Sequence, residues 1–301
     1  MKKGIKLSVK MGILVGLSIV ISVLAVEIMC LQEFKSEFGA NVKMNLETVQ
    51  RGILNNLNNR NIILRNAVVA LSGRPNFIEA MEEGDASLIG DLAEQKRKIV
   101  GNDIMFVTDE RGRVIAGSGG TFYKGTDISD MACVKDIVRE GMSEAKTYES
   151  KSGIIGYSML ASSAIKDSGG NLKGALVAGY DLSKQSFVDH MQNIYNIEIS
   201  IIEGDTRVSS TIKDSNGRSW AGSKVTNNEV IQHVEVKGEI YETDSVLLGQ
   251  NYLNIYFPLK TELGKITGMV STFRNKGAID RTINKVLKAS TIFMCILVII
   301  L

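Results

Sequence analysis

The feature that most constrains the fold of this chain is an internal repeat with one constant offset of 94 residues. Residues 104–118, IMFVTDERGRVIAGS, read as strand, polar turn and strand, and they align with residues 198–212, EISIIEGDTRVSSTI, so that Arg113 falls on Arg207. The same offset aligns three further pairs: Lys166 with Lys260, Gly170 with Gly264, and Gly174 with Gly268. A period this long exceeds that of solenoid repeats, so we predict two related units in tandem.

The order of elements in each unit indicates the fold class. Each unit reads as a strand hairpin, a helical or irregular middle and then three strands, which favours an antiparallel sheet with helices, an α+β fold. An apolar content of 44% and a charged content of 23% are those of an ordinary globular chain. A net charge of +2 gives no basis for a nucleic-acid surface, so we expect no nucleic-acid partner.

An apolar run near the N-terminus predicts a membrane helix. Met11–Leu31 carries one charge, Glu27, and at about 1.5 Å per residue it is long enough to cross a hydrocarbon core of roughly 30 Å. Four lysines precede the run, which places residues 1–10 in the cytoplasm by the positive-inside rule. A cleaved signal peptide is the alternative, but no A-x-A-like site follows the run. We therefore expect an uncleaved transmembrane helix over residues 11–31.

A second apolar run lies at the C-terminus. Residues 289–301, ASTIFMCILVIIL, carry no charge but are fewer than the roughly 20 residues that span a bilayer. The alternative of a buried core helix is disfavoured because such a helix usually keeps one polar face. We expect residues 277–301 to form a coupling segment and the first part of a second transmembrane helix that leads into a cytoplasmic region. Residues 32–285 are then extracytoplasmic.

A long amphipathic helix is predicted between the first membrane helix and the repeat. Apolar residues recur there at spacings of three, four or seven: Phe34, Phe38, Val42, Leu46, Val49, Ile53, Leu57, Leu64, Val68 and Leu71. The pattern ends before Gly73 and Pro75. We predict a stalk helix over residues 32–72, about 60 Å long. It either packs on its own copy in a homodimer or covers a sheet of its own subunit at its far end.

Three stretches of the second unit carry a family resemblance: ISIIEGDTRVSSTI, GRSWAGSK and VKGEIYETDSVLLGQNYLNIYFPLKTELGKITGM. Their Gly-Asp-x-Arg, Gly-Arg…Gly, Gly-x-x-Tyr and Tyr-x-Pro-Leu-Lys motifs resemble, in order and spacing, a Cache sensor domain of the Cache 3 type over residues 193–275. Residues 101–183 resemble a more divergent Cache module. With the stalk and membrane helices, the chain resembles the sensory half of a methyl-accepting chemotaxis receptor with a double Cache domain. The resemblance implies a membrane-distal PAS-like module, residues 73–185, and a membrane-proximal one, residues 186–276.

The resemblance also implies a function. The distal module of such a receptor binds a small molecule, such as an amino acid or an organic acid, and the proximal module passes the signal to the membrane. The receptor is expected to be a multi-pass protein of the cell membrane, to form a homodimer and to act on cytoplasmic chemotaxis proteins through a C-terminal region beyond residue 301. The sensor half of a membrane histidine kinase or nucleotide cyclase, or a non-signalling membrane-anchored binding protein, are the alternatives.

Six polar or aromatic residues are candidates for the distal ligand site: Tyr123, Asp127, Tyr148, Tyr157, Ser162 and Asp181. Tyr157 and Ser162 lie on opposite faces of a predicted strand, and Asp181 follows the closing strand, where its carboxylate can accept from an ammonium group. The others come from the irregular middle, where PAS-like pockets close, and such pockets combine a few polar groups with apolar walls. The alternative is that the tyrosines are packing residues and that Asp181 caps the next helix.

Arg207 and Trp220 are the candidates for an organic-anion site in the proximal module, because arginine pairs well with carboxylates. A structural role for Arg207 in a turn is the alternative. The amino-acid-binding residue set of the double Cache fold is incomplete here, since the one tryptophan lies in the proximal module, so no amino-acid specificity is expected. His190 and His233 have no second ligand at metal spacing, and no nucleophile pair or phosphate loop occurs. We expect no metal, no cofactor and no enzymatic activity.

Overall fold

The computed structural model of the chain describes residues 7–247, 249–261 and 264–300. Residues 1–6 of the predicted cytoplasmic segment and Leu301 of the predicted second membrane helix lie outside the described residues. The chain divides into two compact units, which we describe in turn. The larger unit contains Val49–Thr243 and Asn254–Phe273, and the smaller contains Met1–Thr48, Asp244–Leu253 and Arg274–Leu301.

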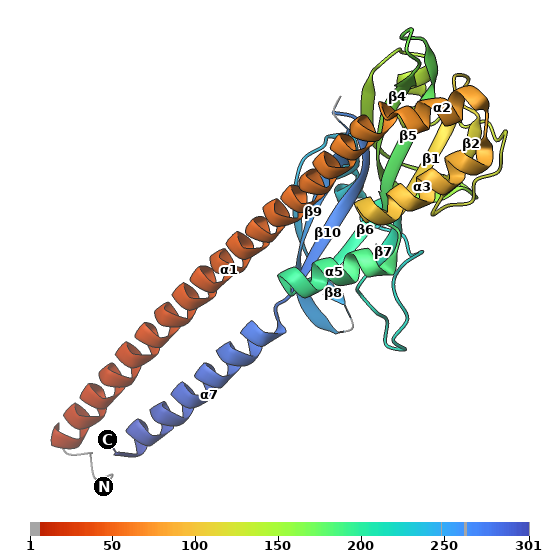
Figure 1. Cartoon of the computed structure of the whole chain (residues 1–301). Helices are drawn as coiled ribbons and strands as arrows, with labels where there is room; N and C mark the ends of the chain where they lie inside the picture. The colour runs from red at the N-terminus through yellow and green to blue at the C-terminus, as the bar shows by residue number, and fades with distance from the viewer. Residues whose placement is uncertain (1–6, 248, 262–263, 301) are drawn as a thin grey trace. The chain divides into compact units, whose positions relative to one another are not determined.

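Two five-stranded antiparallel sheets form the centre of the larger unit (Figure 1). The first has the order β2-β1-β5-β4-β3, with β1 Ile104–Asp109, β2 Val114–Ser118, β3 Glu144–Lys151, β4 Ile155–Lys166 and β5 Leu172–Asp181. The second has the order β7-β6-β10-β9-β8, with β6 Glu198–Glu203, β7 Thr206–Ser210, β8 Tyr241–Leu247, β9 Gln250–Lys260 and β10 Ile266–Asn275. The predicted α+β class and the two antiparallel sheets are confirmed.

The repeat seen in the sequence is also a structural repeat. The bounds of β6 are those of β1 moved by 94 residues, and the bounds of β10 are those of β5 moved by the same amount. Gly170 and Gly264, which precede β5 and β10, both have left-handed backbones, with φ of 82° and 78°. Glycine adopts this conformation without steric cost, so the two halves of the repeat use the same residue for the same turn.

A second pair of glycines allows close packing of the closing strand in each sheet. A Cβ atom added at Gly174 of β5 would lie 1.8 Å from the carbonyl oxygen of Thr108 in β1. A Cβ atom added at Gly268 of β10 would lie 2.5 Å from the carbonyl oxygen of Ile202 in β6. Because Thr108 and Ile202 are themselves 94 residues apart, both sheets depend on the same contact.

The helices of the larger unit form where apolar residues recur at helical spacing, and capping residues set where several of them begin. They comprise the C-terminal part of α1 (Leu7–Ser72), then α2 (Pro75–Glu83), α3 (Ala86–Val100), α4 (Ala132–Val138), α5 (Gln185–Tyr195), the short α6 (Asn228–Val230) and a π-helix, η1 (Ile231–Val236). Asp85 begins α3, where its side chain accepts hydrogen bonds from the backbone N–H groups of Ser87 and Leu88. Pro75 opens α2, which separates it from α1.

The C-terminal part of α1 covers its own subunit. The predicted apolar stripe is buried there: Val49, Ile53, Leu57, Leu64, Val68 and Leu71 are all less than 7% exposed. The guanidinium of Arg60 lies 4.9 Å from the ring centroid of Tyr180 in β5, and the Oγ atoms of Ser72 and Ser163 in β4 are 2.9 Å apart. The far end of the helix therefore has the second of its two predicted roles, and it ends at Ser72 as expected.

The smaller unit contains the N-terminal part of α1 and α7 (Gly277–Ile300). Arg274 donates from Nη1 to Oδ1 of Asn45 over 3.2 Å, and the Ser290 hydroxyl donates to the Glu27 carboxylate. Among the described residues, one helix contains an apolar stretch long enough to cross a bilayer, within Met11–Ser72. The second transmembrane helix remains a prediction.

The repeated glycines generate the first testable prediction. Gly174→Ala and Gly268→Ala should each lower the free energy of unfolding by about 1–3 kcal/mol, because the new methyl group meets backbone atoms that cannot move aside. Urea denaturation of the full chain in detergent measures this. Gly39→Ala is the control, since Gly39 is helical with nothing within 4 Å, and the change should be neutral or stabilising. Unchanged midpoints for both sheet variants would contradict the close-packing argument.

The pH dependence of stability gives a second prediction. Hydrogen bonds from Lys98, Ser118 and Arg97 lower the pKa of Glu94 from 4.5 to about 2. A carboxyl group with a lowered pKa stabilises the folded state above its ordinary pKa, and this contribution is lost as the pH falls toward 2. Glu94→Gln should therefore flatten the fall of the melting temperature between pH 4.5 and 2. Glu82→Gln, at an exposed position of α2, is the control and should leave the slope unchanged.

Candidate ligand-binding site

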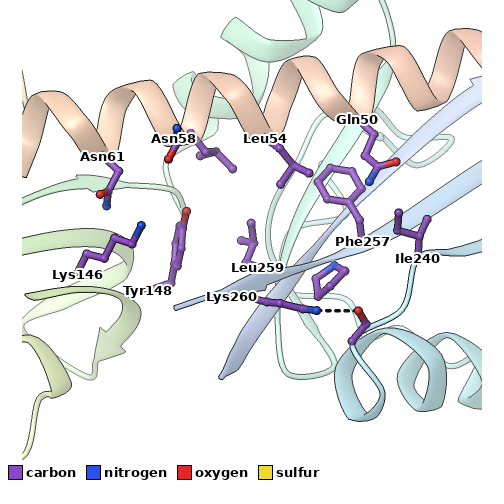
Figure 2. Close-up of a pocket in the computed structure, with 13 residues that line it drawn as sticks. Gln50, Leu54, Asn58, Asn61, Lys146, Tyr148, Ile240, Phe257, Leu259 and Lys260 are labelled. Atoms are coloured by element: carbon purple, nitrogen blue, oxygen red, sulfur yellow. Dashed lines mark hydrogen bonds between the residues drawn. The ribbon is translucent and has the colours of Figure 1, made fainter. Parts of the chain in front are cut away.

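A pocket of about 410 Å³ lies where α1 passes both sheets of the larger unit (Figure 2). Three parts of the chain supply its walls. These are α1 with Gln50, Leu54, Leu57, Asn58 and Asn61, β3 with Lys146 and Tyr148, and the second sheet with Phe257–Lys260 of β9 and the nearby Gly238 and Ile240. Its volume lies within the range of small-molecule sites, about 300–1,000 Å³. Any molecule in it would contact the helix and both sheets at once.

One end of the pocket is polar. Lys146 and Tyr148 are two residues apart on β3, and they pair with Ala161 and Met159 of β4. Both side chains therefore lie on the same face of the sheet, the one that α1 covers. Figure 2 shows both side chains extending toward α1, Lys146 below Asn61 and Tyr148 below Asn58. The Asn61 side chain is on the buried stripe of α1 and is only 5% exposed.

Two polar groups at this end have unused hydrogen-bonding capacity. Within the described part of the chain, neither the Tyr148 hydroxyl nor the Asn61 amide makes a side-chain hydrogen bond. Burial raises the pKa of Tyr148 to about 12, so the hydroxyl stays protonated and can donate. Buried polar groups in folded proteins are usually paired, so unpaired groups beside a cavity indicate a place where a ligand or water binds.

The other end of the pocket is apolar. Phe257 and Leu259 of β9 and Leu57 of α1 are each 1% exposed, and Leu54 of α1 is half-buried. Gln50, 6% exposed, extends from α1 toward Phe257 (Figure 2). The combination of an apolar floor with a few polar groups at one end is typical of small-molecule sites.

The rim on the side of the second sheet is fixed by a hydrogen bond. The Lys260 ammonium at the end of β9 donates to the carbonyl oxygen of Gly238 over 2.9 Å, as Figure 2 shows. Gly238 has a left-handed backbone with φ of 70°. This contact holds the segment that leads from η1 into β8 against β9.

Of the six residues predicted for the distal site, Tyr148 lines this pocket and the other five do not. Tyr157 of β4 is buried, and its hydroxyl lies 3.4 Å from Oγ1 of Thr267 in β10, so it joins the two sheets. Ser162 is buried on the opposite face of β4 and donates to the carbonyl oxygen of Cys133 over 2.8 Å.

Of the remaining three predicted residues, Tyr123 and Asp127 lie in the segment between β2 and α4, and Asp181 is the last residue of β5. Tyr123 is 69% exposed. Oδ1 of Asp127 accepts from the backbone N–H of Ser129 over 3.0 Å, and this hydrogen bond lowers the pKa of Asp127. Oδ1 of Asp181 accepts from the backbone N–H of Ser183 over 3.0 Å, in the turn before α5. The two aspartates therefore both order local turns.

The face of the first sheet opposite α1 is filled by the protein itself. An apolar cluster occupies it: Ile104, Phe106, Val114, Ile128, Met131, Cys133, Val134, Ile155, Leu160 and Val177. The carboxylate of Glu149 accepts from the backbone N–H groups of Ala132 and Cys133 at the start of α4, each over 3.0 Å. Burial raises the pKa of Glu149, and its oxygens occupy the helix terminus that would otherwise attract an anion.

The structure brings the two predicted proximal residues together. Arg207 is 6% exposed, and its guanidinium lies 5.3 Å from the ring centroid of Trp220. Its Nη1 donates to the carbonyl oxygen of Lys224 over 2.9 Å, and burial lowers its pKa. Its Nε has no hydrogen-bond partner among the described residues. The pair lies outside the pocket lining, and in the described ranges no group of three or more acidic, cysteine or histidine residues is arranged for a metal ion.

The sequence analysis missed the contribution of α1 to the site. The sequence did carry a signal for this contribution. In the apolar stripe, Leu57 and Leu64 are seven positions apart, whereas most neighbouring members are three or four positions apart. Asn61 occupies the position in that gap where a further apolar residue would complete the stripe. A polar residue on a buried helical face needs a partner, and here the pocket lies beside it.

Three comparisons with known proteins give different levels of detail, and the family comparison concerns the second half of the repeat. Comparison with curated protein sequences finds no match. Solved structures with a similar arrangement include the Vibrio cholerae histidine kinase DctB sensor domain, at 11% identity and a TM-score of 0.49, covering 78% of this chain and 95% of that one. The sensory domain of the Campylobacter jejuni chemoreceptor Tlp3 (CcmL) is similar at 12% identity and a TM-score of 0.49, covering 83% and 98%. Similarity at this level does not separate chemoreceptors from kinases.

The sequence comparison with protein families is more specific. Residues 182–286 match the family described as single Cache domain 3. This range contains α5, the second sheet and the first part of α7, and it includes the motifs on which the predicted resemblance was based. The match of residues 182–286 to this family agrees with the Cache resemblance that the sequence motifs indicated for the second half of the repeat.

Proposed function

We propose that this chain is the sensory part of a transmembrane receptor that binds a small molecule outside the cytoplasm. The observation that carries the proposal is the continuity of α1, which runs without interruption from Leu7 to Ser72. This one helix contains both the apolar segment, residues 11–31, and five residues of the pocket lining. A ligand in the pocket would therefore contact the same helix that is predicted to cross the membrane.

The Cache domain supplies a second connection toward the membrane. Its closing strand β10 leads into α7 through Asn275 and Lys276, and both residues are held in place. Oδ1 of Asn275 accepts from the backbone N–H of Gly277 over 2.6 Å, and the Lys276 ammonium donates to Oδ1 of Asp244 over 2.6 Å. Because the connection is short and is held by these two hydrogen bonds, it supports the proposal that a movement of β10 is transferred to α7.

The proposed mechanism is a shift between two conformational populations. The ligand contacts α1 through Asn58 and Asn61 and contacts β9 through Phe257 and Leu259, so it favours one packing of the helix on the sheets. It can shift the equilibrium only by the difference between its affinities for the two states. Displacements of about 1–2 Å between packed helices are typical of such switches.

We further propose that the receptor is a chemotaxis receptor. In this proposal residues 73–185 are the membrane-distal module and residues 186–276 the membrane-proximal one, the chain forms a homodimer in the cell membrane, and α7 continues as a second transmembrane helix toward cytoplasmic chemotaxis proteins. The sensor halves of membrane histidine kinases and nucleotide cyclases also need an extracytoplasmic ligand-binding domain that is connected to membrane helices. Swimming assays on cells that lack the gene separate these outputs: loss of the response to a bound compound supports the chemoreceptor, and an intact response contradicts it.

Binding to the pocket is the first test of the sensor. Amino acids, organic acids, amines and purines are screened by thermal shift of the full chain in nanodiscs, where a ligand at 100 times its Kd stabilises the fold by about 2.7 kcal/mol. Asn61→Leu should remove the shift produced by the ligand, because the larger apolar side chain has no amide for it. Asn66→Leu, at an exposed position of the same helix, is the matched control and should retain the shift. A shift that persists in Asn61→Leu places binding elsewhere and contradicts the proposal.

Signalling between the membrane helices is tested by disulfide crosslinking. Glu27→Cys and Ser290→Cys place thiols at two side chains that contact each other across α1 and α7, in a chain that also carries Cys30→Ser and Cys295→Ser. A compound that binds should change the rate of crosslinking in nanodiscs at least threefold. The same chain with Asn61→Leu should show no change. An unchanged rate with a saturating ligand would show that binding does not reach α7.

A further inference from the structure

The two sheets of the larger unit contact each other through a buried tyrosine of the first sheet. Tyr157 of β4 is 1% exposed, and its hydroxyl lies 3.4 Å from Oγ1 of Thr267 in β10. A second contact joins the neighbouring strands: Oγ of Ser150 in β3 donates to Oε1 of Glu203, the last residue of β6, over 2.6 Å. Because β3 is adjacent to β4 and β6 is adjacent to β10, these contacts connect two pairs of neighbouring strands.

Gly268 of β10 provides the space that the Tyr157 ring occupies. A Cβ atom added at Gly268 would lie 2.5 Å from the Tyr157 hydroxyl oxygen and 3.0 Å from Cζ of its ring. Atoms in a close-packed interior do not approach one another this closely. The ring can therefore lie against β10 because residue 268 has no side chain.

The equivalent glycine of the first sheet has a different neighbour. Gly174 and Gly268 are 94 residues apart and hold the same place in the repeat. A Cβ atom added at Gly174 would lie 3.1 Å from Cε of Met81, a residue of α2. In the first sheet this place contacts a helix of the same half of the repeat, whereas in the second sheet it contacts a strand of the other half. The contact between Tyr157 and Gly268 therefore joins the two halves.

Both sides of this contact lead directly to residues that line the pocket. On β4, Tyr157 is two residues from Met159, which pairs with the lining residue Tyr148 of β3. On β10, the Thr267 hydroxyl donates to the carbonyl oxygen of Leu259, a lining residue of β9, over 3.5 Å. Burial raises the pKa of Tyr157, so its hydroxyl stays protonated and can donate to Oγ1 of Thr267. Tyr157 therefore connects the wall formed by β3 with the wall formed by β9.

We infer that Tyr157, packed on Gly268, is a positioning residue that couples the first sheet to β10 and sets the spacing of β3 and β9 across the pocket. This inference rests on the proposed sensory function and adds the route by which a change in the pocket reaches β10. The contact lies near the start of this strand, which runs from Ile266 to Asn275 and leads into α7. A molecule that displaces β3 displaces β10 through Tyr157.

A double-mutant cycle on the full chain in nanodiscs tests the contact itself. Gly268→Ala should lower the melting temperature because the new methyl group meets both the Tyr157 hydroxyl and the carbonyl oxygen of Ile202. Tyr157→Phe removes the first of these two clashes, so Gly268→Ala should lower the melting temperature less in Tyr157→Phe than in the natural chain. Gly174→Ala, at the equivalent place in the first sheet, is the matched control, and its effect should be the same with and without Tyr157→Phe.

Hydrogen exchange of the full chain in nanodiscs tests the coupling. A chain with Asn61→Cys, Cys30→Ser and Cys295→Ser is labelled with benzyl methanethiosulfonate, which places an aromatic group in the pocket. Cys133 is buried and stays unlabelled, as the mass of the intact chain verifies. The label should change the exchange rates of amides in both β3 and β10 by about threefold or more. The same label on Asn66→Cys, at an exposed position of α1, is the control and should change neither strand.

A substitution of Tyr157 separates coupling from stability. In the labelled chain, Tyr157→Leu should keep the response of β3 and lose more than half of the response of β10. Phe106→Leu is the matched control, because it also removes a buried ring but lies in the apolar cluster on the opposite face of the first sheet, and both responses should remain. Circular dichroism and the melting temperature verify the fold of each variant, and Tyr157→Phe replaces Tyr157→Leu if the latter does not fold.

The outcomes separate this inference from the proposed function. The inference is overturned if β10 responds in Tyr157→Leu as it does in the parent chain, if the response of β3 is lost together with that of β10, or if Gly268→Ala has the same effect with and without Tyr157→Phe. An undiminished response of β10 in Tyr157→Leu leaves the proposed sensor standing, because the pocket still communicates with β10 by another route. If the label on Asn61→Cys changes neither strand, the proposed shift between two populations fails together with this inference.

Discussion

The structure of the larger unit depends on burial of one apolar stripe of α1. Between Val49 and Leu71 six side chains of this stripe are removed from water, and each contributes about 1.5–3 kcal/mol by the usual transfer estimates, which are upper bounds. The same stretch of helix contacts elements of both halves of the repeat: Arg60 lies over Tyr180 in the first sheet, and Gly52 lies against the Tyr195 ring at the end of α5. The helix therefore links the two sheets.

The pocket is a consequence of the same packing. The apolar stripe of α1 is interrupted at the pocket by Gln50 and Asn61, which are 6% and 5% exposed. These polar side chains are costly on a buried face unless they find a partner. In the proposed function, a small molecule bound here would give these side chains a partner and would contact the helix directly.

Much of the fold was predictable because its signals are local. Helix periodicity, the left-handed turns at Gly170 and Gly264, and strand alternation act within a few residues, and the 94-residue offset then showed that one pattern is used twice. The site was less predictable. Tyr148 was identified, but its partners on α1 and β9 are distant in sequence, and the face of the first sheet opposite α1 is occupied by a packed cluster around Phe106 and Leu160. Which face of a sheet is filled depends on the volumes of side chains from many segments.

The sequence by itself determined the α+β class, the long N-terminal helix, the tandem repeat and the match of residues 182–286 to a Cache family, because each of these depends on spacing and motif order along the chain. Only the tertiary structure decided that Asn61, Lys146 and Phe257 line one cavity. These residues belong to a helix, to the edge strand of the first sheet and to a strand of the second, and nothing in their local sequence fixes their separation. Long-range packing of α1 on both sheets brings them together, and that packing is set by the combined shape of the buried side chains.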